Sequence, residues 1–403
     1  MTLAYLIAGE SSGDVLGGRL MAALRARVPD IRFAGVGGER MAEAGLQTLF
    51  PMRELALMGL AEVLPNIRRL ARRLDETTAD ITARRPDVIV TIDSPGFTMR
   101  VAGRVRPLGI PLAHYVAPQL WGWRPGRVKH LKARVDRILA LLPFEGAWFE
   151  RHGITVEFVG HPVLESGLDG GDGGAFRARH GVADAERLVL VMPGSRRTEI
   201  SRLLPVFGAA LARLPAGFRA VVPLAGPVAE AVRAGTAGWP LAPILLTGVA
   251  EKADAFAACE IGLIKSGTSS LECAVAGLPH VVAYRVNPIT AAIVRRVVKV
   301  PYANLVNLLL DREVVPELIQ EACRPELIGQ ALLALLGEGE MPTERARHVA
   351  SRATGMAGDA EAQRAGFVEA LNMLYPPGLA PSAAAAEAVL GLFSDLAAGE
   401  ARR

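Results

Sequence analysis

The sequence has 403 residues, which is too long for one typical hydrophobic core and predicts two domains. Hydrophobic residues make up 51% of it, which excludes a disordered protein, and no window of about 18 uninterrupted apolar residues predicts a membrane-spanning helix. The formal net charge is only +4 and aromatic residues make up 5%, without an arm of like charges, so the composition argues against a nucleic-acid partner.

The first half of the chain alternates between strand-like and helix-like segments. Its apolar runs are short and nearly continuous, which is typical of parallel strands that are buried on both faces. The first run lacks a preceding basic region, so we interpret it as a buried strand and not as a signal peptide. Helical patterns lie at residues 15–27 and 39–44, and an amphipathic pattern extends from 60 to 71. The predicted strands are residues 3–8, 32–36, 87–92, 111–116, 137–142 and 156–159.

A second alternating half follows the glycine-rich segment 165–174, which is the best candidate for a linker. We therefore predict an α/β fold with two doubly wound, Rossmann-like domains at 1–164 and 175–375, and a ligand cleft between the carboxyl ends of their sheets. A helical tail at 376–403 follows, and the sequence leaves open whether it packs on the first domain. The predicted strands of the second half are residues 188–192, 219–223, 244–247, 261–264 and 281–284.

The clearest candidate for a binding site is the turn after the strand at 261–264. Ser266, Gly267 and Thr268 form it, and they offer hydroxyl and backbone N–H groups to a phosphate or diphosphate. Glu272 lies one helical turn further on, where its carboxylate could accept hydrogen bonds from a ribose. The alternative is an ordinary helix cap, because Glu272 follows Ser269 by three residues and completes a capping box.

A second turn of this kind follows the strand at 188–192. Gly194 lets the backbone approach a phosphate, Ser195 can donate a hydrogen bond, and Arg196 can bind the phosphate through two N–H groups. Two anion-binding turns in one half of the chain suit a nucleoside diphosphate better than two independent helix caps.

The first half carries a candidate general base. Asp93 ends a strongly apolar strand and precedes Pro95-Gly96, where partial burial can tune the pKa of its carboxylate. The alternative is a turn-forming aspartate that bonds to local backbone N–H groups. Glu10 and Asp14 flank the first strand-to-helix turn, and we assign them to the acceptor surface. The glycine spacing of that turn differs from G-x-G-x-x-G, so the sequence disfavours a nicotinamide cofactor.

No metal or other cofactor is predicted. The sequence has no D-x-D pair for Mg²⁺ on a diphosphate and no His/Cys cluster with metal-ligand spacing. Three scattered histidines are interpreted as structural, and three cysteines as reduced thiols of a cytoplasmic protein. These residues are His114, His161 and His280, and Cys259, Cys273 and Cys323.

An apolar acceptor surface with a basic rim is the last predicted feature. Two of the four tryptophans lie next to a basic residue, and an apolar segment lies upstream of them. Core packing is the alternative for either tryptophan alone. An arginine cluster at 68–73 could attract phosphate groups or an anionic membrane, or could be a solvated helix face. The acceptor-surface residues are Met58, Leu60, Val63, Trp121, Trp123 and Arg124.

Taken in order, these segments resemble the lipid-A-disaccharide synthase family over nearly the whole chain. Each segment alone is weak evidence for the family, but the occurrence of all of them in this order is highly specific for it. The matching segments are AGESSGD at 8–14, GVGG at 35–38, MGLAEVL at 58–64, IDSPGF at 92–97, HYVAPQLWGWR at 114–124, LPFE at 142–145, VGHP at 159–162, PGSR at 193–196, SGT at 266–268 with Glu272, YR at 284–285 and NLL at 307–309.

The resemblance implies an inverting glycosyltransferase of GT-B fold that acts in lipid A biosynthesis of Gram-negative bacteria. It implies UDP-2,3-diacylglucosamine as donor, 2,3-diacylglucosamine 1-phosphate as acceptor, and the β-1,6-linked disaccharide and UDP as products. It makes Asp93 the candidate base, Arg196 a phosphate-binding residue and Asn307 a residue near the donor. It also implies peripheral association with the cytoplasmic side of the inner membrane, and a homodimer in some members.

Two other functions remain as alternatives. A metal-free UDP-sugar epimerase can share this architecture, and it would bury the apolar residues of the acceptor surface in its core. A non-catalytic protein that binds lipid or nucleotide sugar would not need Asp93 for its activity.

Overall fold

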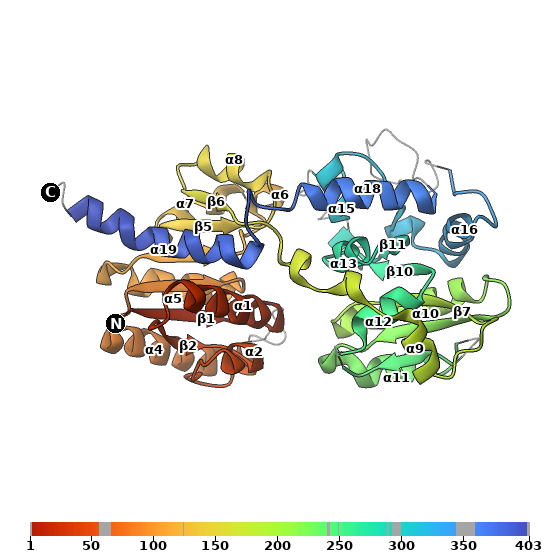
Figure 1. Cartoon of the computed structure of the whole chain (residues 1–403), viewed down its shortest axis with the longest axis horizontal. Helices are drawn as coiled ribbons and strands as arrows, with labels where there is room; N and C mark the ends of the chain where they lie inside the picture. The colour runs from red at the N-terminus through yellow and green to blue at the C-terminus, as the bar shows by residue number, and fades with distance from the viewer. Residues whose placement is uncertain are drawn as a thin grey trace. The chain divides into compact units, whose positions relative to one another are not determined.

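The computed structural model describes residues 2–55, 66–123, 125–239, 242–248, 250–287, 290–291, 300–343 and 359–400. The chain forms two units, each built on a six-stranded parallel sheet (Figure 1). Unit 1 comprises Met1–Glu165 and Leu374–Arg403, and unit 2 comprises Ser166–Met373. The prediction of an α/β fold with two doubly wound halves is confirmed.

The sheet of unit 1 has the strand order β2-β1-β3-β4-β5-β6, with every neighbouring pair parallel. The strands are β1 (Leu3–Ala8), β2 (Arg32–Val36), β3 (Val88–Ile92), β4 (Leu112–Tyr115), β5 (Arg137–Ala140) and β6 (Val156–Phe158). The α-helices are α1 (Ser11–Arg27), α2 (Glu39–Glu43), α4 (Ile67–Arg84), α5 (Pro95–Val105), α6 (Leu120–Trp123), α7 (Val128–Lys132), α8 (Glu145–Glu150) and α19 (Pro381–Glu400).

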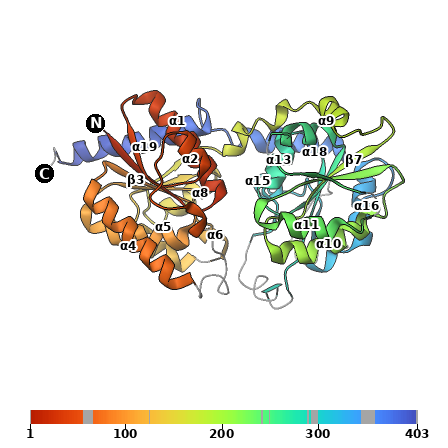
Figure 2. The ribbon, with the colours of Figure 1, turned by 90° about the horizontal axis from the view of Figure 1, so that it is seen from below.

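Both faces of this sheet are buried, which explains the continuous apolar runs. In β1, Leu6 points into the core under α1 and α19, whereas Tyr5 and Ile7 point into the core under α4 and α5. Figure 2 shows α1 and α19 on one side of β3 and α4 and α5 on the other. The last helix of the chain therefore covers the first sheet, with the Arg137 guanidinium donating to the carbonyl oxygen of Ala388 at 2.7 Å.

The sheet of unit 2 has the order β12-β11-β10-β7-β8-β9 and is also parallel throughout. Its strands are β7 (Arg187–Met192), β8 (Phe218–Pro223), β9 (Ile244–Leu246), β10 (Ile261–Lys265), β11 (His280–Tyr284) and β12 (Glu317–Ile319). Its α-helices are α9 (Gly173–Arg179), α10 (Arg197–Leu211), α11 (Ala229–Thr236), α12 (Lys252–Ala258), α13 (Ser269–Val275), α15 (Leu305–Leu310), α16 (Pro325–Leu335) and α18 (Ala360–Asn372).

Helices α10, α11 and α16 cover one face of this sheet, and α9, α13 and α18 lie on the other side (Figure 2). Two details of unit 2 differ from the sequence-based expectation. Strand β12 was not predicted, because its three residues are too few to show a period. The expected linker contributes to the unit, since Leu168 is buried and Gly171 lies against the backbone of Ala253 in α12.

Candidate functional site

Glu10, Asp93 and the two predicted anion-binding turns lie at the carboxyl edges of the two sheets, where ligands bind in open α/β folds. In unit 1, Glu10 follows β1 and Asp93 follows β3, which is the neighbouring strand. In unit 2, the turns at 193–196 and 266–268 follow β7 and β10, and Ile264 of β10 pairs with Met192 of β7. The two predicted anion-binding turns of unit 2 are therefore adjacent.

Asp93 occupies a constrained turn. Its φ is +49° and that of Ser94 is +47°, a left-handed conformation that costs a non-glycine residue about 1–2 kcal/mol. The hydroxyl of Thr98 holds the turn by donating to the carbonyl oxygens of Asp93 and Ser94, each at 3.0 Å. The Asp93 carboxylate is half-buried and has no hydrogen-bond or ion-pair partner in the part of the chain that the structure describes. Turn-forming aspartates normally bond to the local backbone, so that alternative is not realised here.

The turn after β1 packs closely against the turn at Asp93 and Ser94. A β-carbon on Gly9 would lie 2.4 Å from Ser94 Oγ and 2.6 Å from Ser94 Cβ. No side chain fits at that distance, so glycine is required at position 9 by close approach and not by its own backbone angle. The two turns therefore form one packed unit around Asp93.

Asp14 is buried, whereas the sequence-based assignment expects it on an acceptor surface. It is 5% exposed, and its carboxylate accepts hydrogen bonds from the backbone N–H groups of Gly38, Arg40 and Met41 at 2.8, 3.0 and 3.1 Å. Asp14 thus satisfies the free N–H groups at the start of α2. Glu10 is half-buried at the start of α1 and keeps its place beside the Asp93 turn.

In unit 2, the turn after β7 is built around a buried carboxylate that the sequence did not reveal. Glu199 is 5% exposed, and its Oε2 accepts the backbone N–H of Ser195 at 3.2 Å. Its Oε1 lies 3.2 Å from Arg196 Nη1. A β-carbon on Gly194, whose φ is +112°, would lie 2.3 Å from Glu199 Oε2. Glu199 therefore shapes the turn and holds Arg196, half of whose side chain remains exposed.

Lys265 is a second residue that sequence analysis missed. It is the last residue of β10, and its Nζ lies 3.4 Å from Glu199 Oε1 and 5.6 Å from the centre of the Tyr284 ring. The signal available in the sequence was a lysine that ends an otherwise apolar strand directly before Ser-Gly-Thr. The sequence pattern places the end of this strand one residue earlier, at Ile264.

The turn after β10 is not a capping box. Thr268 takes the N-cap position of α13 without a side-chain cap bond, and the Glu272 carboxylate instead binds Lys252 Nζ at 2.6 Å. Ser266 Oγ donates to the carbonyl oxygen of Ala303 at 2.7 Å. Gly267 has a φ of +153°, and Thr268 is exposed. The Thr268 side chain and one carboxylate oxygen of Glu272 can therefore bind other partners.

Asn307 holds a loop together, and the sequence-based expectation that it lies near the donor stays a prediction. It is fully buried. Its amide nitrogen donates to Val315 O and Glu317 Oε1, and its oxygen accepts the backbone N–H groups of Val314 and Val315. Burial, as the largest effect, raises the pKa of Glu317 to about 7.

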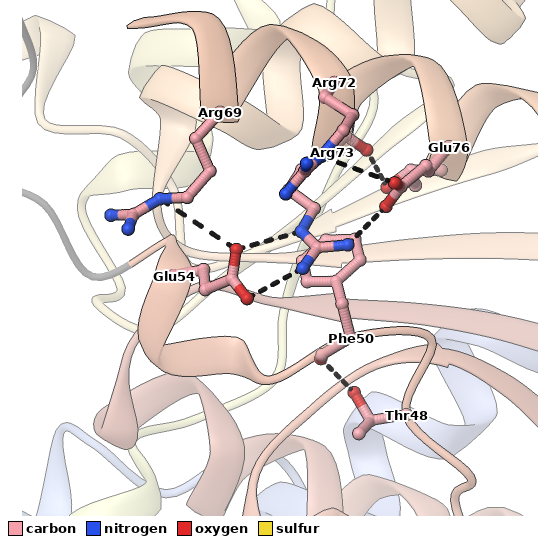
Figure 3. Close-up of polar contacts among 8 residues, drawn as sticks. Thr48, Phe50, Glu54, Arg69, Arg72, Arg73 and Glu76 are labelled. Carbon is pink, nitrogen blue, oxygen red and sulfur yellow. Dashed lines mark hydrogen bonds and ion pairs between the residues drawn. The ribbon is translucent and has the colours of Figure 1, made fainter. Parts of the chain in front are cut away.

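Three of the four arginines in the cluster at 68–73 form ion pairs within unit 1. Figure 3 shows Arg73 between two carboxylates: its guanidinium donates to Glu54 at 2.7 and 2.9 Å and to Glu76 at 2.6 Å. Arg69 lies 3.9 Å from Glu54, and Arg72 lies 3.6 Å from Glu76. The pairs with Glu54 attach the turn at Met52–Glu54 to α4, whereas the pairs with Glu76 lie within α4 itself.

The remaining acceptor-surface residues cannot be placed. Met58, Leu60, Val63 and Arg124 lie outside the described residues, and for Trp121 and Trp123 only the backbone of α6 is described.

The three predicted structural histidines are buried, and burial lowers the pKa of each to about 4, so they are neutral at pH 7. In the described ranges, no group of three or more His, Cys, Asp or Glu side chains is placed to hold a metal ion. The histidines are His114, His161 and His280.

A family model described as lipid-A-disaccharide synthetase matches residues 4–368. The chain belongs to the lipid-A-disaccharide synthase family. It is 50% identical to the lipid-A-disaccharide synthase of Granulibacter bethesdensis over 393 residues, which cover 95% of this chain and 97% of that protein. It is 49% identical to the synthase of Rhodospirillum centenum, over 97% of this chain and 95% of that protein.

Solved structures show the same GT-B architecture at much lower sequence identity. UDP-GlcNAc 2-epimerase from Neisseria meningitidis, bound to UDP-GlcNAc, matches with a TM-score of 0.57 at 13% identity, over 92% of this chain and all of that one. Acinetobacter baumannii MurG matches with a TM-score of 0.56 at 14% identity, over 97% of this chain and all of that one. Likeness at this identity shows the fold alone, so it does not favour the epimerase alternative over the family's reaction.

Among the helices of this synthase-family chain that the structure describes, none has the length and apolar character required to cross a membrane.

Proposed function

We propose that the protein condenses UDP-2,3-diacylglucosamine with 2,3-diacylglucosamine 1-phosphate, forming the β-1,6-linked disaccharide 1-phosphate and UDP. The observation that carries this proposal is the carboxylate of Asp93, which is half-buried, fixed in a left-handed turn and free of partners in the described part of the chain. A carboxylate with these properties suits a general base.

The reaction is a direct displacement. Asp93 accepts the proton of the acceptor 6-hydroxyl while that oxygen forms a bond to the anomeric carbon of the donor. The bond from this carbon to the diphosphate breaks, and its electron pair leaves with UDP. Attack from the face opposite UDP inverts the anomeric centre, and Asp93 then releases its proton to water.

Unit 2 binds the donor. The turn after β7 presents the Ser195 hydroxyl, at the amino end of the 15-residue helix α10, to the diphosphate. Arg196 adds a guanidinium, and Thr268 of the neighbouring turn adds a hydroxyl. Glu272 keeps one carboxylate oxygen for a ribose hydroxyl, since Lys252 binds the other.

The proposed acceptor carries two acyl chains, and the hydrophobic effect favours their transfer from water into a bilayer, so the proposal places the reaction at a membrane surface. We therefore include peripheral association with the cytoplasmic face of the inner membrane in the proposal. Glu10, beside the Asp93 turn, is the described residue that we assign to acceptor binding.

The test is a turnover assay with purified protein, both substrates and EDTA. The proposal predicts that disaccharide and UDP appear together in equal amounts, without added divalent metal. UDP binding without disaccharide at any acyl-chain length would contradict it. Conversion of UDP-GlcNAc to its 2-epimer would support the epimerase instead.

A further inference from the structure

Lys265 occupies an unusual place for a charged side chain. It ends the buried central strand β10, and only 22% of its side chain is exposed. Successive residues of a strand alternate between faces, so Lys265 shares a face with Ile261 and Leu263, whose side chains pack in the core with α10. That direction brings its ammonium to Glu199 at the first turn of α10.

Glu199 holds two cations at once. Its Oε1 lies 3.2 Å from Arg196 Nη1 and 3.4 Å from Lys265 Nζ, longer than the roughly 2.7–2.9 Å of a strong charge-assisted hydrogen bond. One buried carboxylate therefore orients two positive charges. Within this group of three side chains, one positive charge is left in excess.

The ammonium of Lys265 also lies against the second anion-binding turn. A β-carbon on Gly267 would lie 3.3 Å from Lys265 Nζ. An ammonium has three N–H donors, and Glu199 and the face of the Tyr284 ring lie around it. Lys265 thus lies beside the turn at 266–268, while its partner Glu199 shapes the turn at 193–196.

The leaving group needs this additional charge. The diphosphate of a UDP-sugar carries about two negative charges and gains another as the bond to the sugar breaks, and fixed cations stabilise such developing charge best. Arg196 alone supplies one positive charge. We propose that Lys265 is a second cationic ligand of the donor diphosphate and that Glu199 is the positioning residue that holds it there.

This inference rests on the proposed function for the identity of the donor, but it can be tested without the acceptor. The probes are UDP and uridine, titrated calorimetrically into wild-type protein and into Lys265→Met. Methionine keeps a similar length and removes the charge. We expect affinity for UDP to fall by roughly 10- to 100-fold, the range for a hydrogen bond to a charged group, and affinity for uridine to stay within about twofold.

A matched control removes one positive charge elsewhere in unit 2. Arg233→Met replaces an exposed residue of α11 and should leave UDP affinity unchanged. Lys265→Arg keeps the charge and should restore most of the UDP affinity. If Lys265→Met does not fold, Lys265→Gln, which can still donate to Glu199, replaces it with the same expected loss.

The outcomes separate this inference from the proposed function. Selective loss of UDP affinity supports the inference even if the turnover assay yields no disaccharide. UDP affinity within twofold of wild type, or an equal loss for UDP and uridine, overturns it while leaving turnover by the wild-type protein intact. Failure of the wild-type protein to bind UDP overturns both the inference and the proposed function.

Discussion

The backbone N–H of Asp93 donates to the carbonyl oxygen of Tyr115 at 2.9 Å. This bond extends the β3–β4 ladder one residue beyond the last pair, Ile92 and Tyr115, into the turn. The carbonyl oxygen of Asp93 meanwhile accepts from Thr98, so the residue is fixed on both sides of its α-carbon. Its side chain is therefore positioned by the backbone alone, and changing it should leave the turn intact.

Asp93→Asn should lower kcat by about 10²–10⁴, the usual contribution of a general base, because an amide cannot accept the proton of the acceptor hydroxyl. Affinity for UDP should stay within about twofold, and the thermal midpoint should not fall, since the carboxylate has no partner in the described part of the chain. Steady-state kinetics and UDP titration check both points. Turnover at the wild-type rate would remove Asp93 as the base.

Arg196→Ala should raise KM for the donor and lower kcat together, with kcat/KM falling roughly 10-fold or more, because its guanidinium binds the diphosphate before and during departure. Arg197→Ala is the matched control. Arg197 is the exposed neighbour on the first turn of α10 and has no ion pair among the described residues. An equal fall in kcat/KM in the two variants would indicate a general effect of charge and not a specific contact between Arg196 and the diphosphate.

Gly160→Ala should detach the C-terminal segment from unit 1. Gly160 has a φ of +77°, and a β-carbon there would lie 2.4 Å from Pro376 Cδ and 2.8 Å from Leu374 O. The left-handed backbone costs about 1–2 kcal/mol and the overlap about 1–3 kcal/mol more. Gly378→Ala is the control, because Gly378 has a φ of +71° with nothing within 4 Å of a β-carbon.

The difference between the thermal midpoints of the two variants separates the cost of the left-handed backbone from the cost of the steric overlap. Limited proteolysis reports whether α19 is released. We expect Gly160→Ala to lose clearly more stability than Gly378→Ala and to be cut faster before α19. Equal losses would mean that the contact between Gly160 and the segment at 374–376 does not hold the tail.

His161 should make the stability of unit 1 depend on pH. Burial lowers its pKa from 6.5 to about 4, and its Nδ1 accepts the backbone N–H of Val163 at 3.1 Å, which requires the neutral ring. The unfolded state therefore binds more protons between these two pKa values. The contribution of His161 is fully present above about pH 6.5 and is lost as the pH falls through about 4, amounting to about 3 kcal/mol at most.

His161→Asn tests this pH dependence, since the asparagine oxygen can accept the same N–H but does not titrate. Unfolding free energies from denaturant titration at pH 7.5, 5.5 and 4.5 should show the wild-type protein losing more stability than the variant as the pH falls. If the unfolding free energies of the two proteins changed with pH in parallel, this would contradict the conclusion that His161 is neutral and buried.

The position of the catalytic candidates could be predicted from sequence because it follows from local patterns. Continuous apolar runs mark parallel strands that are buried on both faces, and the polar residues that follow such strands lie at one edge of a sheet. Asp93 and the turns at 193–196 and 266–268 were found in this way. Strand boundaries were within one or two residues for most runs, since the polar flanks interrupt the pattern.

The functions of individual polar side chains could not be read from those patterns. Asp14 and Asn307 lie in segments that match the family, yet both are buried. Asp14 bonds to backbone N–H groups, and Asn307 bonds to backbone groups and to Glu317. Conversely, Glu199 resembled an ordinary first-turn glutamate and Lys265 an ordinary strand end. When the hydrogen-bond partner of a residue lies far away in the sequence, the residues around it show no hydrophobic pattern that reveals the partner.

The sequence by itself determined the fold class, the family and the edge of each sheet at which polar residues gather, because these depend on hydrophobic period and on the order of motifs along the chain. Only the tertiary structure decided which charges are free. It pairs Arg73 with Glu54, turns Lys265 toward Glu199 across two elements, and leaves Asp93 without a partner in the part of the chain that is described. Charge pairing depends on distances between segments that are far apart in the chain, and those distances exist only after folding.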